Sequence, residues 1–188
     1  MTRVARLILA SALLPLFAVT AGGQEFDPFQ TNSLFALAKA GKYAAIEDRL
    51  NQGDSPNSIG ENGATALIVV SQTGRCDIAM LLLKRQARTD IKDREGNTAL
   101  MYAAQRGNLP CLEALIAARA DVNAINRQGE NALMLAARSG KVDAIKVLIE
   151  AKADVTATDF SGATALSHAE GARQRQAAEA LRAAGARK

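Results

Sequence analysis

The sequence has no tryptophan, one histidine (His168), two cysteines (Cys76 and Cys111) and four prolines. Aromatic residues make up only 4% of it. β-Sandwiches and barrels are built on aromatic and β-branched side chains, so this scarcity argues against them. A single histidine also excludes most catalytic and metal-binding arrangements, because these need several such groups close together. The composition therefore favours a helical fold without an evident catalytic centre.

Small and apolar residues are what the sequence has in quantity. Hydrophobic residues make up 48% of the chain, charged residues 22%, and alanine alone occupies 39 positions. This apolar fraction excludes wholesale disorder. Alanine is the strongest helix former, and its small side chain lets helices pack closely. The 188 residues suffice for one domain or a short repeat array, but not for two full-sized enzyme domains.

The first segment has the three parts of a secretory signal peptide. Residues 1–21 start with Arg3 and Arg6, continue with an apolar run over residues 7–19, and end in small residues. This run is too short to cross a bilayer as a helix, which takes about 20 residues. We therefore expect cleavage after Ala21, with cleavage after Gly23 as the alternative. An uncleaved anchor and a buried N-terminal helix are the less favoured interpretations.

Export would change the charge of the protein and place it in a compartment. Removal of Arg3 and Arg6 lowers the net charge from +4 to +2, so residues 22–188 are nearly neutral. No cysteine stands near the cleavage point, which argues against a lipid-anchored N-terminus. The hypothesis is a bacterial periplasmic protein with no stable membrane anchor after cleavage.

A 33-residue period runs through the rest of the chain. The columns that keep it are Gly63, Gly96, Gly129 and Gly162; Leu67, Leu100, Leu133 and Leu166; and Gly41, Gly74, Gly107 and Gly140. Several columns with one spacing identify an internal repeat. The array has five units, at about residues 27–59, 60–92, 93–125, 126–158 and 159–188.

The third unit indicates what each unit folds into. Thr98 can cap a first helix, which Gly107 ends. A second helix follows, with Leu109, Leu112 and Leu115 at helical spacing, and a polar turn leads to the next unit. One helix pair cannot bury its apolar face alone, but stacked copies can. The prediction is an all-α solenoid of helix-turn-helix units with β-turn fingers.

At these residues the chain resembles the ankyrin-repeat family, whose 33-residue repeat has a Gly followed by a Thr-Pro-Leu-His-x-Ala-Ala block. The matching stretches are Gly96-Asn97-Thr98-Ala99-Leu100-Met101-Tyr102-Ala103-Ala104 and Gly129-Glu130-Asn131-Ala132-Leu133-Met134-Leu135-Ala136-Ala137. The segments at residues 120–124 and 153–157 are similar to the family's Ala-Asp-Val-Asn-Ala segment. The resemblance covers about residues 27–185.

The chain also departs from the family pattern at identifiable columns. Alanine replaces the usual proline in four units, and the usual histidine is absent, which predicts the loss of a side-chain hydrogen bond between turns. The residues in the histidine column are Ile68, Met101, Met134 and Ser167. Gln86, Arg119 and Lys152 stand where the family usually has glycine, at a position that tends to need a positive φ. These departures affect the predicted stability rather than the fold.

Catalysis is not expected, because the residues and motifs that it would need are missing from the sequence. His168 lies in the last unit, two or three units from Cys76 and Cys111, too far for a Cys-His pair. No phosphate-binding Gly-x-x-x-x-Gly-Lys motif occurs, and a metal site would lack clustered His and Cys ligands. We therefore predict no catalytic residue, no cofactor and no metal site.

The two cysteines leave two interpretations open. Cys76 and Cys111 are 35 residues apart, each near the start of the second helix of its unit. In an oxidising periplasm they could form a disulfide that clamps two units together. A disulfide needs Cα atoms within about 7 Å, whereas packed helices lie about 8–10 Å apart. The alternative is two small apolar residues with free thiols in the core.

A concave surface formed by the turn tips and the ends of the first helices is what the ankyrin resemblance implies for binding. An arginine stripe recurs on this surface, formed by Arg94, Arg106, Arg127 and Arg138. Arginine is favoured at interface hot spots. Phe160, an aromatic residue in a polar turn, either anchors a partner or packs on the last unit. The candidate protein-binding residues are Arg94, Glu95, Asn97, Gln105, Arg106, Arg127, Gln128, Glu130, Arg138, Ser139 and Phe160.

The functional hypothesis is a non-catalytic protein-protein interaction module that binds another protein in the periplasm. One alternative is a redox-responsive accessory protein that uses Cys76 and Cys111. Another is nucleic-acid binding through the arginine stripe, but the net charge of +2 and the glutamates between the arginines disfavour it. No nucleic-acid partner is therefore expected.

Overall fold

The computed structural model describes residues 33–186 of the chain. The predicted signal peptide, residues 1–21, and the start of the predicted first unit lie outside the described residues.

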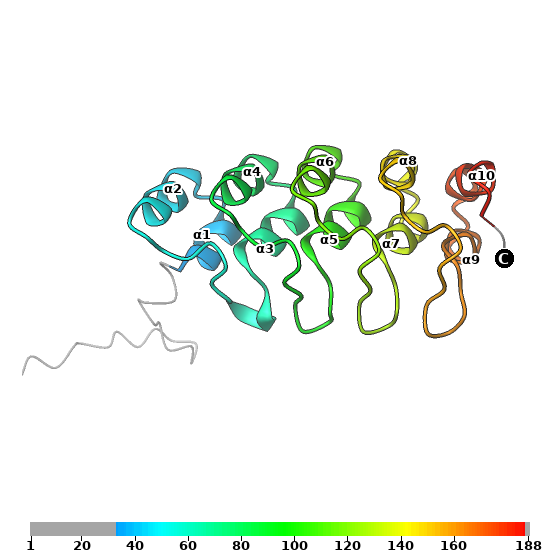
Figure 1. The fold of residues 1–188 in the computed structure, drawn as a ribbon, viewed down its shortest axis with the longest axis horizontal. Coiled ribbons are helices and arrows are strands. Elements are labelled where there is room, and N and C mark those ends of the chain that lie inside the picture. Colours follow the sequence, from blue (N-terminus) through cyan, green and yellow to red (C-terminus); the bar gives the residue numbers. More distant parts are fainter. Residues whose placement is uncertain (1–32, 187–188) are drawn as a thin grey trace, which may run out of the picture.

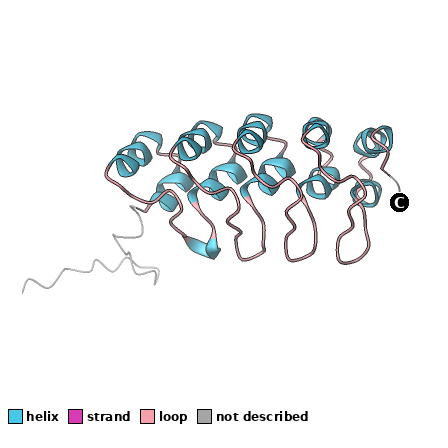
Figure 2. Cartoon of the chain, viewed as in Figure 1, coloured by secondary structure: helices cyan, strands magenta, loops and turns pink. Residues whose placement is uncertain are grey.

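Residues 33–186 form five antiparallel helix pairs that stack side by side in chain order (Figure 1). The first helices of the pairs make one row and the second helices another, and the loops between pairs project as fingers below both rows (Figure 1). The loops are irregular: only isolated bridges, such as Thr158 to Thr164, occur in them (Figure 2). The pairs are α1 (Leu34–Ala40) with α2 (Tyr43–Asn51), α3 (Ala66–Thr73) with α4 (Cys76–Lys84), α5 (Ala99–Arg106) with α6 (Leu109–Ala117), α7 (Ala132–Arg138) with α8 (Val142–Glu150), and α9 (Ala165–Gly171) with α10 (Arg175–Ala183); the short 3-10 helix η1 (Glu61–Gly63) lies in the first finger. The predicted all-α solenoid is thus confirmed.

Each of the last four first helices begins at a side-chain cap in the same column. The hydroxyl of Thr98 accepts a hydrogen bond from the backbone N–H of Met101 at 3.3 Å, as predicted. Thr65, Asn131 and Thr164 cap their helices in the same way. Where the family usually has histidine, the sulfur of Met101 accepts a bond from the N–H of Thr98 at 3.4 Å. At Met101, this contact between sulfur and backbone therefore takes the place of the histidine hydrogen bond that was expected to be lost.

Helix ends follow the predicted columns as well. Gly107 has a left-handed backbone with φ of 72° and ends α5. After the second helices, Gln86, Arg119 and Lys152 have φ values of 62°, 61° and 70°. The prediction of positive φ at these non-glycine residues is confirmed. A left-handed conformation at a non-glycine residue costs roughly 1 kcal/mol or more, so each of these positions is a local strain within a regular array.

The core runs continuously along the stack between the two rows of helices. Leucines of one column, Leu67, Leu100, Leu133 and Leu166, are all buried, and so are the alanine pairs that follow them in α5 and α7. These small side chains let neighbouring first helices contact one another closely. The last helix, α10, buries Ala177 and Leu181 and exposes arginines on its other face, as expected of an end cap.

Within residues 33–186, every helix is much shorter and less apolar than a membrane crossing requires. The longest have nine residues, whereas a crossing takes about 20.

Candidate functional site

Each of the last three fingers is held in shape by one side chain. The Oδ1 atom of Asp93 accepts hydrogen bonds from the backbone N–H groups of Glu95 and Asn97 at 3.1 and 2.8 Å. Asn126 and Asp159, one and two periods later, make the same pair of bonds within their own fingers. Short polar side chains that bind backbone groups two and four residues on stabilise such turns. Each of these three fingers therefore carries its own internal brace, whereas the first finger has Gly60 in this column.

Backbone hydrogen bonds also join each finger to the next. The N–H of Arg94 donates to the carbonyl of Asn62 at 2.9 Å, and the N–H of Arg127 donates to the carbonyl of Glu95 at 3.1 Å. Phe160 continues the series by donating to Gln128 at 3.1 Å. We call this row the finger ladder. It requires close approach: a Cβ added at Gly129, which has a φ of 79°, would lie 2.7 Å from the nitrogen of Phe160.

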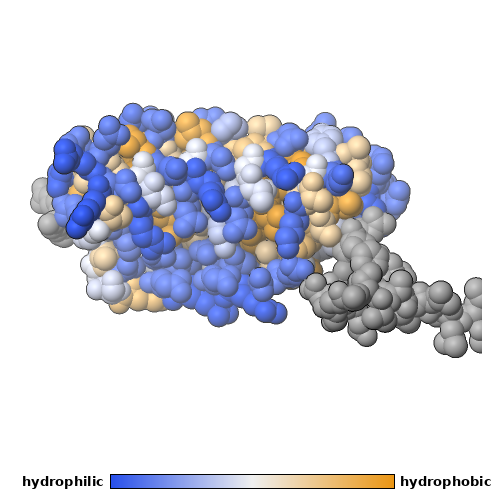
Figure 3. Space-filling model, turned by 180° about the vertical axis from the view of Figure 1, so that it is seen from behind, coloured by the Kyte–Doolittle hydropathy of each residue, from blue (hydrophilic) through white to orange (hydrophobic). Residues whose placement is uncertain are grey.

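The inner face of the solenoid is the surface formed by the first helices together with the fingers. Seen from behind, the molecule is polar over most of the fingers, and apolar patches lie among polar ones in the band above them (Figure 3). Among the predicted binding residues, the exposed ones are Arg94, Glu95, Arg106, Arg127, Gln128 and Phe160, and the half-buried ones are Asn97, Gln105, Arg138 and Ser139. Phe160 is 73% exposed, so most of its ring is available at the end of the finger ladder.

Glu130 differs from the other predicted contact residues because it is buried, with 7% of its surface exposed. Its carboxylate accepts hydrogen bonds from Asn126 at 3.0 Å and from the guanidinium of Arg138, with which it forms an ion pair. A buried carboxylate needs such partners. Glu130 and Arg138 are therefore engaged with each other, and the unpaired cations of the predicted stripe are Arg94, Arg106 and Arg127 within the described residues.

A polar network connects fingers and first helices beneath the exposed residues. The hydroxyl of Tyr102, on α5, donates to Oδ2 of Asp93 at 2.7 Å. Burial, and after it the bond to Asp93, together raise the pKa of Tyr102 to about 12. The amide of Asn126 donates to Oδ1 of Asn97 at 3.0 Å, which ties the finger that holds Asn126 to the finger that holds Asn97. The network fixes the fingers against the helices.

In the last unit His168, on α9, takes the place that Tyr102 has in the third. Its Nε2 atom lies 2.8 Å from Oδ2 of Asp159. The hydroxyl of Ser161 bonds Oδ1 of Asp159 and, together with further bonds from backbone N–H groups and His168, holds the pKa of that carboxyl well below its usual range. Asp159 is therefore a carboxylate at neutral pH.

The inner face is hollowed between the first three units. This hollow, of about 360 Å³, has Phe35, Ile68, Val69 and Tyr102 at its base and Glu61, Gln72 and Glu95 at its rim. The base is apolar and the rim is polar, as in many protein contact sites. A second hollow beside Gln105, Arg106, Ser139 and Lys141 carries two cationic side chains. Three of its four residues are predicted binding residues.

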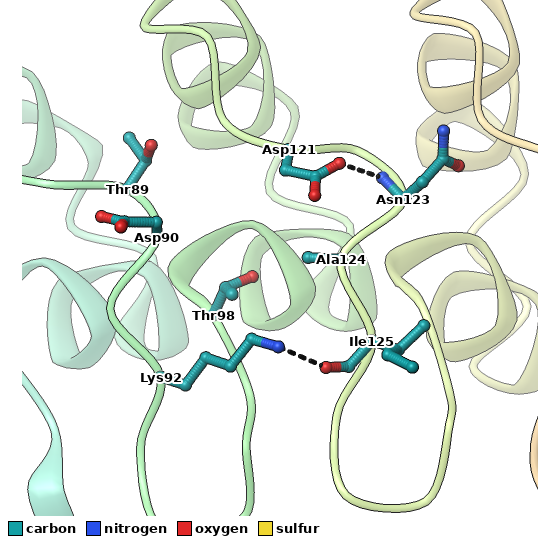
Figure 4. A pocket seen from close by; sticks show the side chains of 8 residues that line it. All are labelled: Thr89, Asp90, Lys92, Thr98, Asp121, Asn123, Ala124 and Ile125. Carbon is teal, nitrogen blue, oxygen red and sulfur yellow. Dashed lines mark hydrogen bonds between the residues drawn. The ribbon is translucent and has the colours of Figure 1, made fainter.

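A further hollow of about 310 Å³ lies between the loops that lead from α4 and α6 into their fingers (Figure 4). Lys92 crosses it and donates to the carbonyl of Ile125 at 2.7 Å, and Asp121 accepts from the N–H of Asn123 at 2.9 Å. Asp90 at its edge is paired with Arg88. Because its polar groups hold neighbouring loops together, this hollow is a structural junction, and the predicted binding residues lie elsewhere.

Cys76 and Cys111 form a disulfide in the structure. Cys76 begins α4 and Cys111 lies in the first turn of α6, so the bridge joins the second helices of neighbouring units. The Cα atoms are 4.9 Å apart, well inside the spacing of the helix axes that made the bridge doubtful from sequence. Helix ends can approach more closely than axes, which accounts for the difference. Cys111 is fully buried and Cys76 is half-buried.

Sequence reasoning missed the grouping of Glu130, Asp159 and His168, whose ligand atoms all lie within 4.8 Å of one another. The absence of a second histidine had argued against any such cluster. The signal that would have found it is the 33-residue register. Asn97 and Asn126, one period before Glu130 and Asp159, are hydrogen-bonded, and so are Asp93 and Tyr102, two periods before Asp159 and His168. Once the contacts of one unit are known, the next can be read from the period.

Five stacked helix pairs, braced fingers and an inner face of exposed polar side chains define a helical repeat solenoid of the binding type. A family model described as ankyrin repeats (3 copies) matches residues 34–126, and one described as ankyrin repeats (many copies) matches residues 117–169. The chain belongs to the ankyrin-repeat family, whose repeats generally bind other proteins and are typically non-catalytic. A search of curated proteins finds no match.

Proposed function

We propose that this protein is a non-catalytic scaffold that binds another protein on its inner face, after export to the periplasm. The observation that carries the proposal is the row of exposed side chains on the finger ladder. Arg94, Arg127 and Phe160 occupy successive fingers, and their backbone nitrogens are held by the ladder bonds. Side chains on a rigid, preorganised surface lose little freedom on binding.

The charges of the finger ladder and of the neighbouring helix ends suggest the chemistry of the partner. Arg106 and Arg127 are exposed and form no ion pair within the described residues, and Lys141 lies in the same hollow as Arg106. Arginine can bind a carboxylate through two parallel hydrogen bonds. Phe160 adds an apolar contact at the end of the row. We therefore propose a partner surface with acidic side chains beside an apolar one.

Export to the periplasm rests on the N-terminal segment and is supported by the disulfide. Residues 1–21 have the pattern of a signal peptide, and Cys76 pairs with Cys111. Disulfides persist in oxidising compartments such as the periplasm and are rare in the cytosol of mesophiles. N-terminal sequencing of protein recovered from a periplasmic fraction tests this part, since an intact Met1 in a cytosolic fraction contradicts it.

The binding proposal is tested by affinity capture from a periplasmic fraction with the double variant Arg106→Glu and Arg127→Glu. We expect capture to be lost while circular dichroism stays native, because both side chains are exposed and unpaired. The matched control reverses two lysines on the second helices, Lys84→Glu and Lys146→Glu, away from the inner face. Equal capture by both double variants would contradict the assignment of the inner face.

A redox-responsive role is the alternative that the disulfide raises. It requires a bridge that opens and closes in use, yet the bridge joins two packed helices, with Cys111 fully buried and Cys76 half-buried. Buried disulfides are poorly accessible to thiol exchange. We therefore favour a structural clamp. If Cys76→Ser with Cys111→Ser retains partner capture, the clamp proposal stands; loss of capture by a folded double variant favours the redox role.

A further inference from the structure

Three metal-ligating side chains meet at the junction of the fourth and fifth units. They are Glu130, Asp159 and His168, and one ligand atom from each lies within 4.8 Å of the other two. Their side chains are 9%, 7% and 15% exposed, so the cluster is shielded but not sealed from solvent. In the part of the chain that the structure describes, no other such cluster of three occurs.

The fold places each of the three groups independently. Glu130 lies at the end of one finger, Asp159 in the brace of the next finger, and His168 one turn into α9. The Oδ1 atom of Asp159 is used by the finger brace, which turns Oδ2 toward the Nε2 atom of His168 at 2.8 Å. The carboxylate is therefore fixed by the loop and presents one oxygen to the cluster.

No preceding unit carries all three ligand types in these columns. Glu130 is preceded by Asn97 one period earlier, Asp159 by Asn126 and then Asp93, and His168 by Leu135 and then Tyr102. Asn126 and Asn97 bond each other, Tyr102 donates to the carboxylate of Asp93, and Leu135 packs in the core. The repeat thus folds with amide, phenol or aliphatic side chains here. Ligands of a metal are not needed for the finger to form.

We propose that Glu130, Asp159 and His168 bind a divalent transition-metal ion, Zn²⁺ in the first place. An imidazole nitrogen with two carboxylate oxygens is a ligand set that Zn²⁺ accepts, at about 2.0–2.2 Å for each bond. A tetrahedral ion with such bonds holds its ligands about 3.4 Å apart, so the three groups need only small side-chain shifts. The fourth position is left for water. The three ligands are none of the side chains on which the proposed partner surface rests, which are Arg94, Arg106, Arg127 and Phe160.

Arg138 opposes the ion at this site. Its guanidinium is paired with Glu130 and would repel a second cation. The Arg138 side chain is 41% exposed, so it can turn toward solvent when a metal displaces it. Removing this charge should therefore strengthen metal binding, whereas removing a ligand should weaken it. The two opposite effects distinguish a metal site from general changes in stability.

The test is calorimetric titration of the oxidised, full mature chain with ZnCl₂ at neutral pH, after removal of any polyhistidine tag. The disulfide is kept intact so that no thiol competes for the ion. The ligand variants copy the repeat's own residues: Glu130→Asn as at position 97, Asp159→Asn as at 126, and His168→Leu as at 135. Each should weaken Zn²⁺ binding by about tenfold or more, and Arg138→Gln should strengthen it several-fold.

Because His168 is the single histidine of the chain, its ring reports on the site directly. We expect Zn²⁺ to shift the Nε2 resonance of His168 in nitrogen-15 spectra of the wild type, and Mg²⁺ or Ca²⁺ at the same concentration to leave it in place. Circular dichroism of each variant checks that it folds. An unmoved His168 resonance, or Zn²⁺ binding of equal strength in wild type and all three ligand variants, would overturn the proposal.

Discussion

Cys76 and Cys111, 35 positions apart, are joined by a disulfide that closes a loop containing all of α5. The bridge ties the second helices of two neighbouring units, which also pack against each other. A repeat array depends on contacts between neighbouring units only. A covalent link at one junction therefore stabilises that junction and reduces the freedom of the unfolded chain around it.

Reduction of this disulfide should lower the free energy of unfolding by about 2–4 kcal/mol, because the closed loop of 35 residues restricts the unfolded state. The measurement is urea unfolding followed by circular dichroism, with and without a phosphine reductant. The double variant Cys76→Ala and Cys111→Ala serves as control and should be insensitive to the reductant. Identical unfolding midpoints for the oxidised and reduced wild type would contradict a stabilising clamp.

Lys152→Gly should raise the melting temperature by about 2–4 °C. Lys152 has a φ of 70°, which costs a non-glycine residue about 1 kcal/mol, and glycine adopts it without strain. The hydrogen bond that its carbonyl accepts from Asn123 uses the backbone and is retained. Ala151→Gly is the matched control: with a φ of −77°, it should lower the melting temperature. A lower melting temperature for Lys152→Gly would show that relief of backbone strain does not outweigh the freedom that glycine adds to the unfolded chain.

Asp159→Asn should reduce the sensitivity of the fold to acid. The pKa of Asp159 is lowered in the folded protein, chiefly by the hydrogen bond from Ser161. Its contribution to stability is therefore complete above the unfolded pKa of about 4 and is lost as the pH falls below it. The variant should be less stable than wild type at pH 7, and the difference should shrink between pH 5 and pH 2 in urea titrations. A difference that is constant with pH would refute the linkage.

Tyr102→Phe should flatten the loss of stability in alkali. The pKa of Tyr102 is raised to about 12, mainly by burial, so the folded state favours the neutral phenol. Its contribution is complete below the unfolded value of about 10 and is lost as the pH rises from there to about 12. Absorbance at about 295 nm follows the ionisation, and the high-pH step should be missing in the variant. A step that persists would assign it to Tyr43 instead.

Much of the scaffold follows from the period and from local chemistry. Thr98 is predicted to cap a helix and does so, and Gly107 is predicted to end that helix and has a left-handed backbone. Lys152 stands in a column where the family has glycine, and it has the expected positive φ. These are properties of single residues in their immediate surroundings. They repeat every 33 residues, so one unit predicts the next.

The site was less predictable because its contacts depend on how each finger lies against the helices and on how closely neighbouring helix ends approach. A glutamate in a polar turn is expected to be exposed, yet Glu130 is buried, because the brace of Asn126 folds its finger back toward Arg138. The distance between Cys76 and Cys111 depends on how closely two helix ends approach, which average helix spacings do not give. His168 resembles an isolated helix residue until the column of Tyr102 is known to face the finger.

The finger ladder uses backbone atoms alone, from position 62 to 94, 95 to 127 and 128 to 160. Each bond therefore spans 32 positions whatever side chains stand at its ends. Excision of a whole 33-residue unit leaves donor and acceptor in register. Exchange of an exposed fingertip side chain, the close-packed glycines such as Gly129 excepted, leaves the spacing between fingertips unchanged. The backbone bonds of the ladder therefore set the spacing of the fingers, while the exposed side chains set what the surface can bind. Single exposed side chains can be exchanged without disturbing the ladder.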